Sequence, residues 1–400
     1  MSPDSPLKKC GTGASPVRTT AEGGCATPTS DENRDSPEPQ PGLFQRAAKR
    51  ILLTSVNNLG DCVVFLPVAA AARAAWPEAR LTLLTGRRGA EAAALTGLMD
   101  DVLPLPPSRR YPPKAKLLAL VPRLRAEKFD LAFMAGGDSS FVSLLLYLGG
   151  VKTRIGFADC SLSGLLTSRV KATALELEAR RNFRLAEMAG LTGPMPRPPC
   201  RIRPEMAEAA QRRLSELGVS LSGAPLLLVH PGSSTPLRRW PAERFAELCR
   251  RVTADGLARP LLLEGPAEAG LGESLGAQSH APVLRNVESI ELLGAIMAQC
   301  GLFLGQSSGP MHVAFLVGTP TVSLWGDADP AIWGPAWEEE RHLLIRTPHP
   351  CAGCAQWTAR HAVTRCRPGM PCESCMEAVT LDTVLEAVER QLRTLSARRP

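Results

Sequence analysis

A regular alternation of short apolar runs and segments with helical spacing constrains the fold of this chain more than any other feature. From Arg50, the run ILLTSV precedes a turn, NNLGD, and then a segment of helical length, CVVFLPVAAAARAAW. The same order returns in LTLLT (81–85), DVLPL (101–105), a helical segment at about 114–127 and DLAFMA (130–135). Strands that alternate with helices form parallel sheets with helices on both faces. The chain is therefore predicted to be an α/β protein.

A proline-rich stretch at 193–204, GPMPRPPCRIRP, interrupts the alternation, and a second series follows it. The second series contains helices predicted at 205–217, 241–254 and 289–300, between the apolar runs PLLLVHPG, PLLLEG, LFLGQ and TVSLWG. We therefore expect two Rossmann-like domains, at 46–195 and 196–400, joined by a proline-stiffened linker. Ligands of such sheets bind at the carboxyl ends of the strands, so a central cleft between the domains is the expected active site.

Composition limits the classes of function. Residues 1–45 are rich in Pro, Ser, Thr and Gly and are predicted to form a disordered tail. An aromatic content of 4% and a net charge of +7 argue against nucleic acid and favour anionic small molecules or an anionic membrane surface. The apolar run around 141–151 is shorter than the roughly 18 residues of a membrane span. Because the N-terminus also lacks the apolar part of a secretory signal, we expect a cytoplasmic protein whose cysteines are mostly thiols.

One strand of the second series ends in a Gly/Ser/Thr loop, within HPGSSTPLRRWPAERFAEL (230–248). The helix that begins near Pro241 offers free N–H groups at its N-terminus. Three hydroxyl side chains lie in the loop: Ser233, Ser234 and Thr235. Arg238 and Arg239 add planar cationic donors that match phosphate oxygens. The pattern suits a diphosphate; the alternative is an ordinary loop with solvated arginines.

A second polar loop occurs in LFLGQSSGPMHVAFLVGTPTVSLWG (302–326). Ser307, Ser308 and Gly309 form a turn before a short predicted helix, which Gly318 terminates. His312 falls in the first turn of that helix and could reach a ligand hydroxyl or phosphate. A single histidine on a helix can equally be structural.

In the first series, Asp61 follows the first strand and lies at its carboxyl end. A carboxylate there could accept a proton from an attacking hydroxyl group. The alternative is that Asp61 is only the N-cap of the apolar helix that follows.

Five segments, in this order and spacing, resemble glycosyltransferase family 9: ILLTSVNNLGDCVVFLP, KTRIGF (152–157), HPGSSTPLRRWPAERFAEL, LLLEGPAE (261–268) and SSGPMHVAFLVGTPTVSLWG. The family contains the heptosyltransferases that build the inner core of bacterial lipopolysaccharide, and the resemblance covers about residues 50–390. It implies a GT-B fold with an ADP-heptose donor held by the C-terminal domain and an anionic glycolipid acceptor held by the N-terminal domain. It also implies inversion at the anomeric carbon without a metal or other cofactor.

Individual positions also match the family. The resemblance implies that Asp61 is the general base, that Thr235 and Arg238 lie near the donor phosphates, and that His312 belongs to the donor site. Glu268 matches the acidic residue on the nucleotide ribose, with Glu264 as the alternative. The remaining loop positions assigned to the donor are Ser233, Ser234, Ser307, Ser308 and Gly309.

Ser307 departs from the family, which usually has an aspartate there. Serine keeps a hydrogen-bonding group but loses the charge and the reach of the carboxylate. The substitution therefore keeps open a different sugar nucleotide as donor.

Basic residues of the N-terminal domain could bind the anions of the acceptor or attach the protein loosely to the inner membrane. We assign Lys152 and Arg154 to the acceptor. The other basic residues considered are Arg109, Arg110, Lys114, Lys116, Arg180, Arg181 and Arg184. Each of these can equally be a solvated surface charge.

Two C-x-x-C pairs, Cys351 with Cys354 and Cys372 with Cys375, have the spacing of a structural zinc site within the Cys-rich segment 351–375. Ordinary thiols or a disulfide are the alternative, which we favour because the chemistry of the family needs no metal.

The leading hypothesis is thus a family 9-like glycosyltransferase of lipopolysaccharide-core assembly. Another sugar-nucleotide enzyme on the same fold, such as an epimerase, and an inactive sugar-nucleotide-binding protein are the alternatives. Because a pure binder needs no base, Asp61 together with Arg238 argues against the latter.

Overall fold

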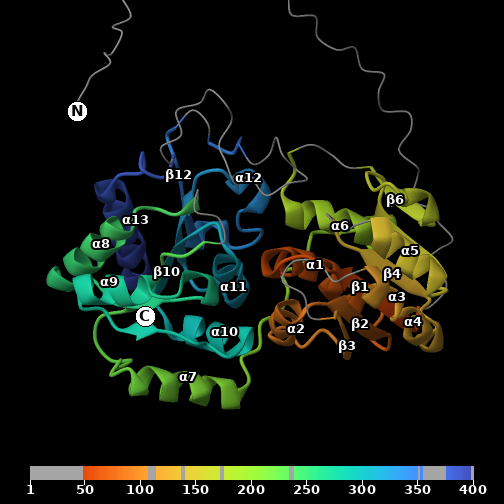
Figure 1. Ribbon diagram of the computed structural model, residues 1–400, viewed down its shortest axis with the longest axis horizontal. Coiled ribbons are helices and arrows are strands. Elements are labelled where there is room, and N and C mark those ends of the chain that lie inside the picture. Colours follow the sequence, from red (N-terminus) through yellow and green to blue (C-terminus); the bar gives the residue numbers. More distant parts are fainter. Residues whose placement is uncertain are drawn as a thin grey trace, which may run out of the picture. The chain divides into compact units, whose positions relative to one another are not determined.

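Two parallel six-stranded sheets form the framework of the protein (Figure 1). The structure is a computed structural model that describes residues 48–106, 114–136, 140–171, 175–233, 238–349, 352–354 and 375–397. The strand orders are β3-β2-β1-β4-β5-β6 and β12-β11-β10-β7-β8-β9, and all neighbouring strands pair in parallel. The α/β prediction is therefore confirmed.

The first sheet comes from the first predicted series. Its strands are β1 (Arg50–Ser55), β2 (Arg80–Thr85), β3 (Asp101–Pro104), β4 (Leu131–Met134), β5 (Thr153–Phe157) and β6 (Ser168–Val170). Its helices are α1 (Leu59–Ala75), α2 (Arg87–Ala94), α3 (Lys114–Leu118), α4 (Val121–Glu127), α5 (Ser140–Leu148) and α6 (Glu178–Met188), with a 3-10 turn, η1, at Ser163–Leu165. Successive side chains of β1 enter different cores, because Ile51 and Leu53 pack in the cluster that contains α1 whereas Leu52 packs in the cluster that contains α5. Helices thus cover both faces of the sheet.

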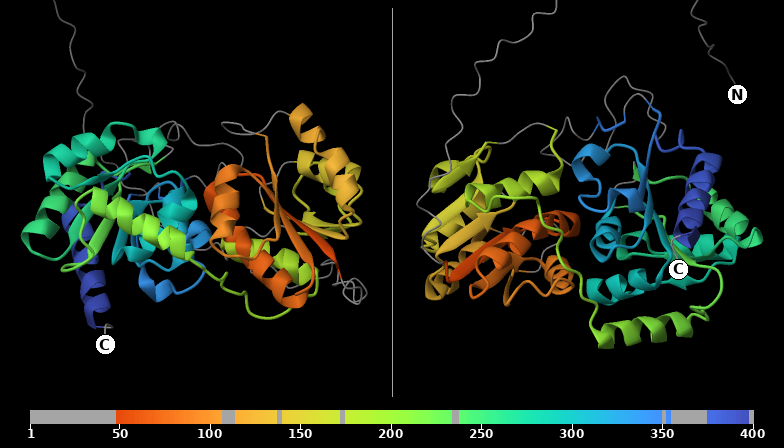
Figure 2. Two further views of the ribbon diagram at one scale, coloured as in Figure 1. Left: turned by 90° about the horizontal axis from the view of Figure 1, so that it is seen from below. Right: turned by 180° about the vertical axis from the view of Figure 1, so that it is seen from behind.

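The second sheet repeats this layering. Its strands are β7 (Leu226–His230), β8 (Arg259–Leu263), β9 (Val283–Leu284), β10 (Leu302–Gln306), β11 (Thr321–Trp325) and β12 (His342–Arg346). Its helices are α7 (Pro204–Glu216), α8 (Ala242–Ala254), α9 (Leu271–Ser279), α10 (Ile290–Gln299), α11 (Gly309–Val317), α12 (Pro330–Trp333) and α13 (Leu381–Ala397), with 3-10 turns η3 (Pro266–Glu268) and η4 (Glu339–Arg341). The two views of Figure 2 show α7 alongside α10, on which it packs. The C-terminal helix α13 packs against α8 and the central strands.

Local sequence signals explain several helix ends. Gly318 ends α11 in the left-handed conformation, as predicted, with φ 78°. The single helix expected at about 114–127 is instead the pair α3 and α4, because Pro122 occupies one of the first helical positions of α4. α1 starts at Leu59, earlier than expected, since Asn58 is its N-cap.

Contacts between helices connect the two series. α1 packs against α11 and α2 against α10, and their buried side chains belong to one hydrophobic cluster. The carboxyl of Glu91 on α2 accepts the backbone N–H of Ile290, the first residue of α10, at 2.9 Å. The first turns of α1 and α11 therefore meet, and each follows the carboxyl end of a central strand.

The predicted tail at 1–45 lies outside the described residues, and the domain boundary at residues 195 and 196 stays a prediction. None of the helices in the described ranges is both long and apolar enough to span a bilayer.

Candidate functional site

Three loops meet at the carboxyl edge of the second sheet, after β7, β10 and β11. β10 lies between the other two strands. The side chain of Gln306, at the end of β10, is fully buried. Its carbonyl oxygen accepts the N–H of Trp240 at 2.6 Å, and its amide donates to the carbonyl of Pro231 at 2.6 Å. One side chain thereby fixes both ends of the loop after β7, so the two loops predicted to bind the donor are brought together.

His230 and Ser308 form a second link between these loops. The Nδ1 of His230 lies 3.3 Å from the Ser308 hydroxyl. Burial, aided by the Arg239 guanidinium, lowers the pKa of His230 to about 4, so its imidazole is neutral at pH 7. Ser308 is the N-cap of α11, but its hydroxyl makes no capping hydrogen bond. Within the described residues, the N–H groups of the first turn of α11 therefore lack this common side-chain acceptor.

The two arginines of the loop after β7 are not solvated surface charges. Arg239 donates from Nε and Nη2 to the carbonyl of Ser233, at 3.1 and 2.9 Å. The Nε of Arg238 lies 2.9 Å from each carboxylate oxygen of Asp327, which is 2% exposed. Asp327 was not among the predicted site residues, because no local sequence pattern marks it. Ser234 and Thr235 lie outside the described residues.

Glu268 and its alternative, Glu264, occupy different environments. Glu268 is buried against the loop after β7, where a Cβ atom on Gly232 would overlap its carboxyl group. Burial raises the pKa of Glu268, and the Arg239 guanidinium opposes that shift. Glu264 accepts the N–H of Gly272 at 2.7 Å and so stabilises the start of α9. Both carboxyl groups thus bond to backbone, Glu268 with Gly265 and Glu264 with Gly272, and the assignment of Glu268 to the ribose stays a prediction.

His312 lies where the first turns of α1 and α11 meet. It is buried, and burial lowers its pKa to about 4. Its Nδ1 has no hydrogen-bond partner among the described residues. A Cβ atom on Gly60 would lie only 2.7 Å from Cδ2 of His312, so the glycine permits the close approach. The first turn of α11 therefore lies against Gly60, the residue before Asp61.

Asp61 takes part in capping α1, although not as predicted. Asn58 is the N-cap, and Asp61 is the third helical residue, whose carboxylate accepts the Asn58 N–H at 2.9 Å. This reciprocal arrangement is a capping box. The reading of Asp61 as the N-cap itself is therefore wrong by three positions. Burial raises the pKa of Asp61, whereas the hydrogen bonds with Asn58 lower it.

Glu178 and Arg181, on the first turns of α6, lie near Asp61. Burial raises the pKa of Glu178; Arg181 opposes the shift, and the charge of Asp61 adds to it. Arg181 donates to Glu178 at 3.1 Å and stacks over the ring of Phe157, with 4.3 Å from Cζ to the ring centre. Arg181 is one of the basic residues considered for the acceptor, whereas Glu178 was not predicted.

Lys152 and Arg154 do not lie at the carboxyl edge of the first sheet, where Asp61 lies. Lys152 precedes β5 and pairs with Asp130 at 2.9 Å, while Arg154, near the start of β5, donates to the carbonyl of Leu165 at 2.7 Å. Both therefore lie at the amino end of the strand, opposite the edge that carries Asp61. Their assignment to the acceptor stays a prediction.

Each C-x-x-C pair has one cysteine among the described residues, Cys354 and Cys375, and both lie near Gly326. Gly353 donates its N–H to the carbonyl of Gly326 at 2.8 Å, and a Cβ atom on Gly326 would lie 2.9 Å from Sγ of Cys375. Cys354 follows Gly353 in the chain, whereas Cys351 and Cys372 lie outside the described residues. In the described ranges, no three His, Cys, Asp or Glu side chains form a group that could hold a metal ion. The structural metal site stays an open prediction.

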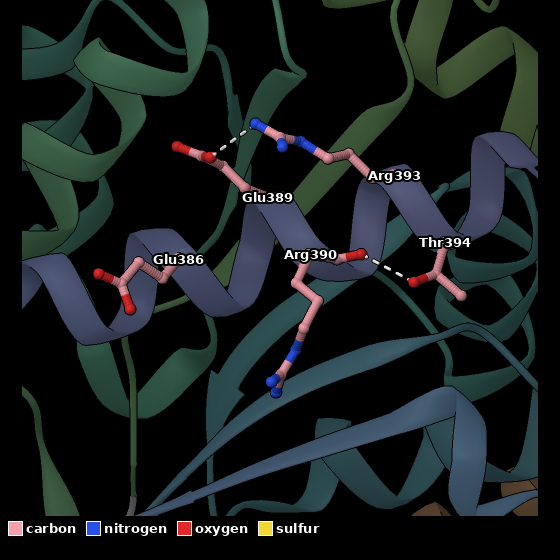
Figure 3. A pocket seen from close by; sticks show the side chains of 5 residues that line it. All are labelled: Glu386, Glu389, Arg390, Arg393 and Thr394. Atoms are coloured by element: carbon pink, nitrogen blue, oxygen red, sulfur yellow. Dashed lines mark hydrogen bonds and ion pairs between the residues drawn. The ribbon is translucent and has the colours of Figure 1, made fainter.

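A hollow on the outer side of α13 is unrelated to these loops (Figure 3). It is lined by five side chains of this one helix: Glu386, Glu389, Arg390, Arg393 and Thr394. Arg393 pairs with Glu389 at 3.2 Å within the helix. Charges paired along one exposed helix face are typical of a solvated surface.

Comparison with known proteins identifies the class. The family model for glycosyltransferase family 9 (heptosyltransferase) matches residues 117–360, more than half of the chain. The chain therefore belongs to this family, and it is a heptosyltransferase-like glycosyltransferase with the predicted GT-B fold.

Individual relatives agree. Lipopolysaccharide heptosyltransferase 2 of Escherichia coli K12 is 24% identical over 313 residues, covering 74% of this chain and 88% of the relative. The solved structure of E. coli ADP-heptose lps heptosyltransferase II has a TM-score of 0.69 at 19% identity, covering 87% of this chain and 99% of that one. The iron-containing dodecameric glycosyltransferase TibC of enterotoxigenic E. coli H10407 has a TM-score of 0.51 at 13% identity, covering 87% and 77%.

Proposed function

We propose that this protein transfers a heptose from ADP-heptose to an anionic acceptor of the lipopolysaccharide-core type, with inversion at the anomeric carbon. The observation that supports the proposal is the contact between the first turns of α1 and α11, where a Cβ atom on Gly60, the residue before Asp61, would lie 2.7 Å from His312. A general base and a site for a nucleoside diphosphate are the two parts that such a transfer needs.

The proposed step is a single displacement. The acceptor hydroxyl attacks the anomeric carbon from the face opposite the diphosphate, and its oxygen forms the new glycosidic bond as the bond to ADP breaks. Asp61 accepts the proton of the hydroxyl group. ADP leaves with its negative charge stabilised by the N–H groups of α11 and by the Arg238 guanidinium.

We propose that the transfer itself needs no metal, since these N–H groups and Arg238 supply the positive charge that a cation would otherwise provide. Activity should then survive exhaustive EDTA treatment. Loss of turnover that added Mg²⁺ or Mn²⁺ restores would contradict this part of the proposal. Metal analysis of the untreated protein tests the cysteine segment separately.

A different sugar nucleotide is the second candidate donor, and Ser307 is the observation that favours it. Ser307 is 7% exposed, and its N–H bonds to the carbonyl of Leu324 at 3.3 Å, so it sits within the donor-side edge. A serine there offers a sugar neither the charge nor the reach of the usual carboxylate.

We also propose that the protein works in the cytoplasm at the inner membrane, because a nucleotide sugar and a glycolipid must meet there. In support, the net charge of +7 suits attraction to anionic lipids. Cosedimentation with phosphatidylglycerol vesicles, compared with phosphatidylcholine vesicles, tests the association.

The deciding experiment incubates the purified protein with ADP-heptose and an inner-core glycolipid, and follows ADP release together with the mass of the glycolipid. We expect equal amounts of ADP and of a product heavier by one heptose, with an inverted anomeric configuration by NMR. ADP-heptose consumption without a heavier glycolipid, or transfer only from another donor, would contradict the proposal.

A further inference from the structure

Arg238 and Asp327 join loops that follow two strands that are not neighbours. Arg238 belongs to the loop after β7 and Asp327 to the loop after β11, and β10 lies between these strands. The ion pair therefore bridges the carboxyl end of β10, where Ser307 and the N-terminus of α11 lie. Donor phosphates at that helix N-terminus would lie beside the pair.

The geometry of the pair leaves part of the guanidinium available. Both carboxylate oxygens of Asp327 lie 2.9 Å from the same atom, Nε of Arg238. The side chain of Asp327 is 3% exposed, whereas that of Arg238 is 28% exposed. In the described part of the chain, the hydrogen bonds of Arg238 to Asp327 use Nε alone, so that carboxylate does not engage the fork of the two Nη groups. Such a fork matches two phosphate oxygens.

We infer that Asp327 is a positioning residue for the donor: it holds Arg238 by Nε so that both Nη groups face the diphosphate. The inference deepens the proposed function and rests on it. A long, flexible side chain loses rotamer entropy when it binds an anion, and a fixed guanidinium has already lost most of it. Asp327 would thus increase affinity for the nucleotide without touching it.

A purely structural brace is the competing explanation, and the two differ in a measurable way. A structural role of Asp327 that does not act through the guanidinium persists when Arg238 is absent, whereas a brace made by the pair itself lowers the melting temperature when either residue is removed. A positioning residue acts on the ligand through Arg238, so its effect on ligand affinity disappears once Arg238 is removed. A double-mutant cycle separates the two.

The experiment measures ADP binding by calorimetry for the full chain and for Arg238→Ala, Asp327→Ala, Asp327→Asn and the Arg238→Ala/Asp327→Ala double variant. We expect Arg238→Ala to weaken ADP binding about ten- to a hundredfold. Asp327→Ala should weaken it about tenfold, and Asp327→Asn, which keeps one acceptor oxygen and the side-chain shape, by less. In the Arg238→Ala background, Asp327→Ala should change the affinity by less than about twofold.

Asp329→Asn is the matched control, because Asp329 is a buried carboxylate of the same loop that instead caps α12 by accepting the Ala331 N–H at 2.9 Å. Its ADP affinity should equal that of the unchanged protein. An equal loss from Asp327→Ala with and without Arg238, or melting temperatures that fall while ADP affinity stays constant, would overturn the positioning role alone. Unchanged ADP affinity in Arg238→Ala would overturn it together with the phosphate role of Arg238 in the proposed function.

Discussion

The carboxyl edges of the two sheets are held in different ways. At the first sheet, Asp61 is fixed by a capping box within its own helix, through a residue three positions away. At the second sheet, Gln306, the His230–Ser308 contact and the Arg238–Asp327 pair link loops that are 66 to 89 residues apart in sequence. The difference indicates that the proposed donor side is held by long-range polar contacts, whereas Asp61, the proposed base, is positioned locally. Hydrogen-bond donors that are already in position stabilise a leaving diphosphate without the free-energy cost of reorganisation.

The largest effect is expected at Asp61, the proposed base. Asp61→Asn should lower turnover at least about a hundredfold, since the amide cannot accept the acceptor proton. The free energy of unfolding should change by less than about 0.5 kcal/mol, because an amide oxygen can still accept the Asn58 N–H. Steady-state kinetics and urea unfolding measure the two effects.

Asn58→Ala is its control. That variant should cost about 1 kcal/mol of stability while each folded molecule keeps most of its turnover. If Asp61→Asn is instead as active as the unchanged protein, Asp61 serves only the helix.

Removing the polar contacts at the carboxyl edge of the second sheet should lower both the stability of the protein and its affinity for ADP. Gln306→Leu leaves the Trp240 N–H and the Pro231 carbonyl buried without their partner and should cost about 2–3 kcal/mol of unfolding free energy. ADP binding should weaken as well, because the loop after β7 loses its anchor. Urea unfolding and calorimetry measure the two effects.

Asn182→Leu supplies the comparison in the first half, where Asn182 accepts the buried Gly136 N–H at 2.8 Å. It should lower stability but leave ADP affinity unchanged. Equal ADP affinities for the two variants would show that the donor loops are not held by Gln306.

Ser307 tests what the donor edge recognises. Ser307→Asp should shift preference toward ADP-heptose by about ten- to a hundredfold, the effect of about 1–3 kcal/mol expected when a hydrogen-bond partner is gained. The measurement is kcat/KM for a panel of sugar nucleotides with both proteins. Efficient ADP-heptose transfer by the unchanged protein, without improvement in the variant, would show that Ser307 is neutral.

The last prediction concerns the pH dependence of stability at His312, where the first turns of α1 and α11 meet. Its pKa is about 4 in the folded protein and about 6.5 in the unfolded chain, so between these values only the unfolded chain binds the proton. Stability therefore falls as the pH drops from 6.5 to 4, by up to about 1.4 kcal/mol per pH unit for this group. His312→Gln should remove that contribution, and urea unfolding at several pH values should show a shallower slope. An identical slope in both proteins would mean that His312 titrates normally when folded.

The sequence by itself determined the alternation of strands and helices, because apolar periodicity and the glycine and proline signals at helix ends act over a few residues. The family motifs also located both donor-side loops and Asp61. Local sequence patterns fail where packing decides: one helix was expected in place of α3 and α4, and the elements not predicted are β5, β6, β9, β12, α5, α6, α9, α12 and α13. These elements are short, edge-located or amphipathic, so neighbouring layers determine their structure.

Only the tertiary structure decided which polar side chains share the site. Asp327 lies 89 residues from Arg238, and Glu178 is more than a hundred positions from Asp61, so no window of sequence contains either pair. Parallel strand order brings the ends of β7, β10 and β11 together. Burial lowers the pKa values of His230 and His312 and raises those of Asp61 and Glu178. Desolvation depends on everything packed around a group, which is a property of the fold rather than of the residues beside it in the chain.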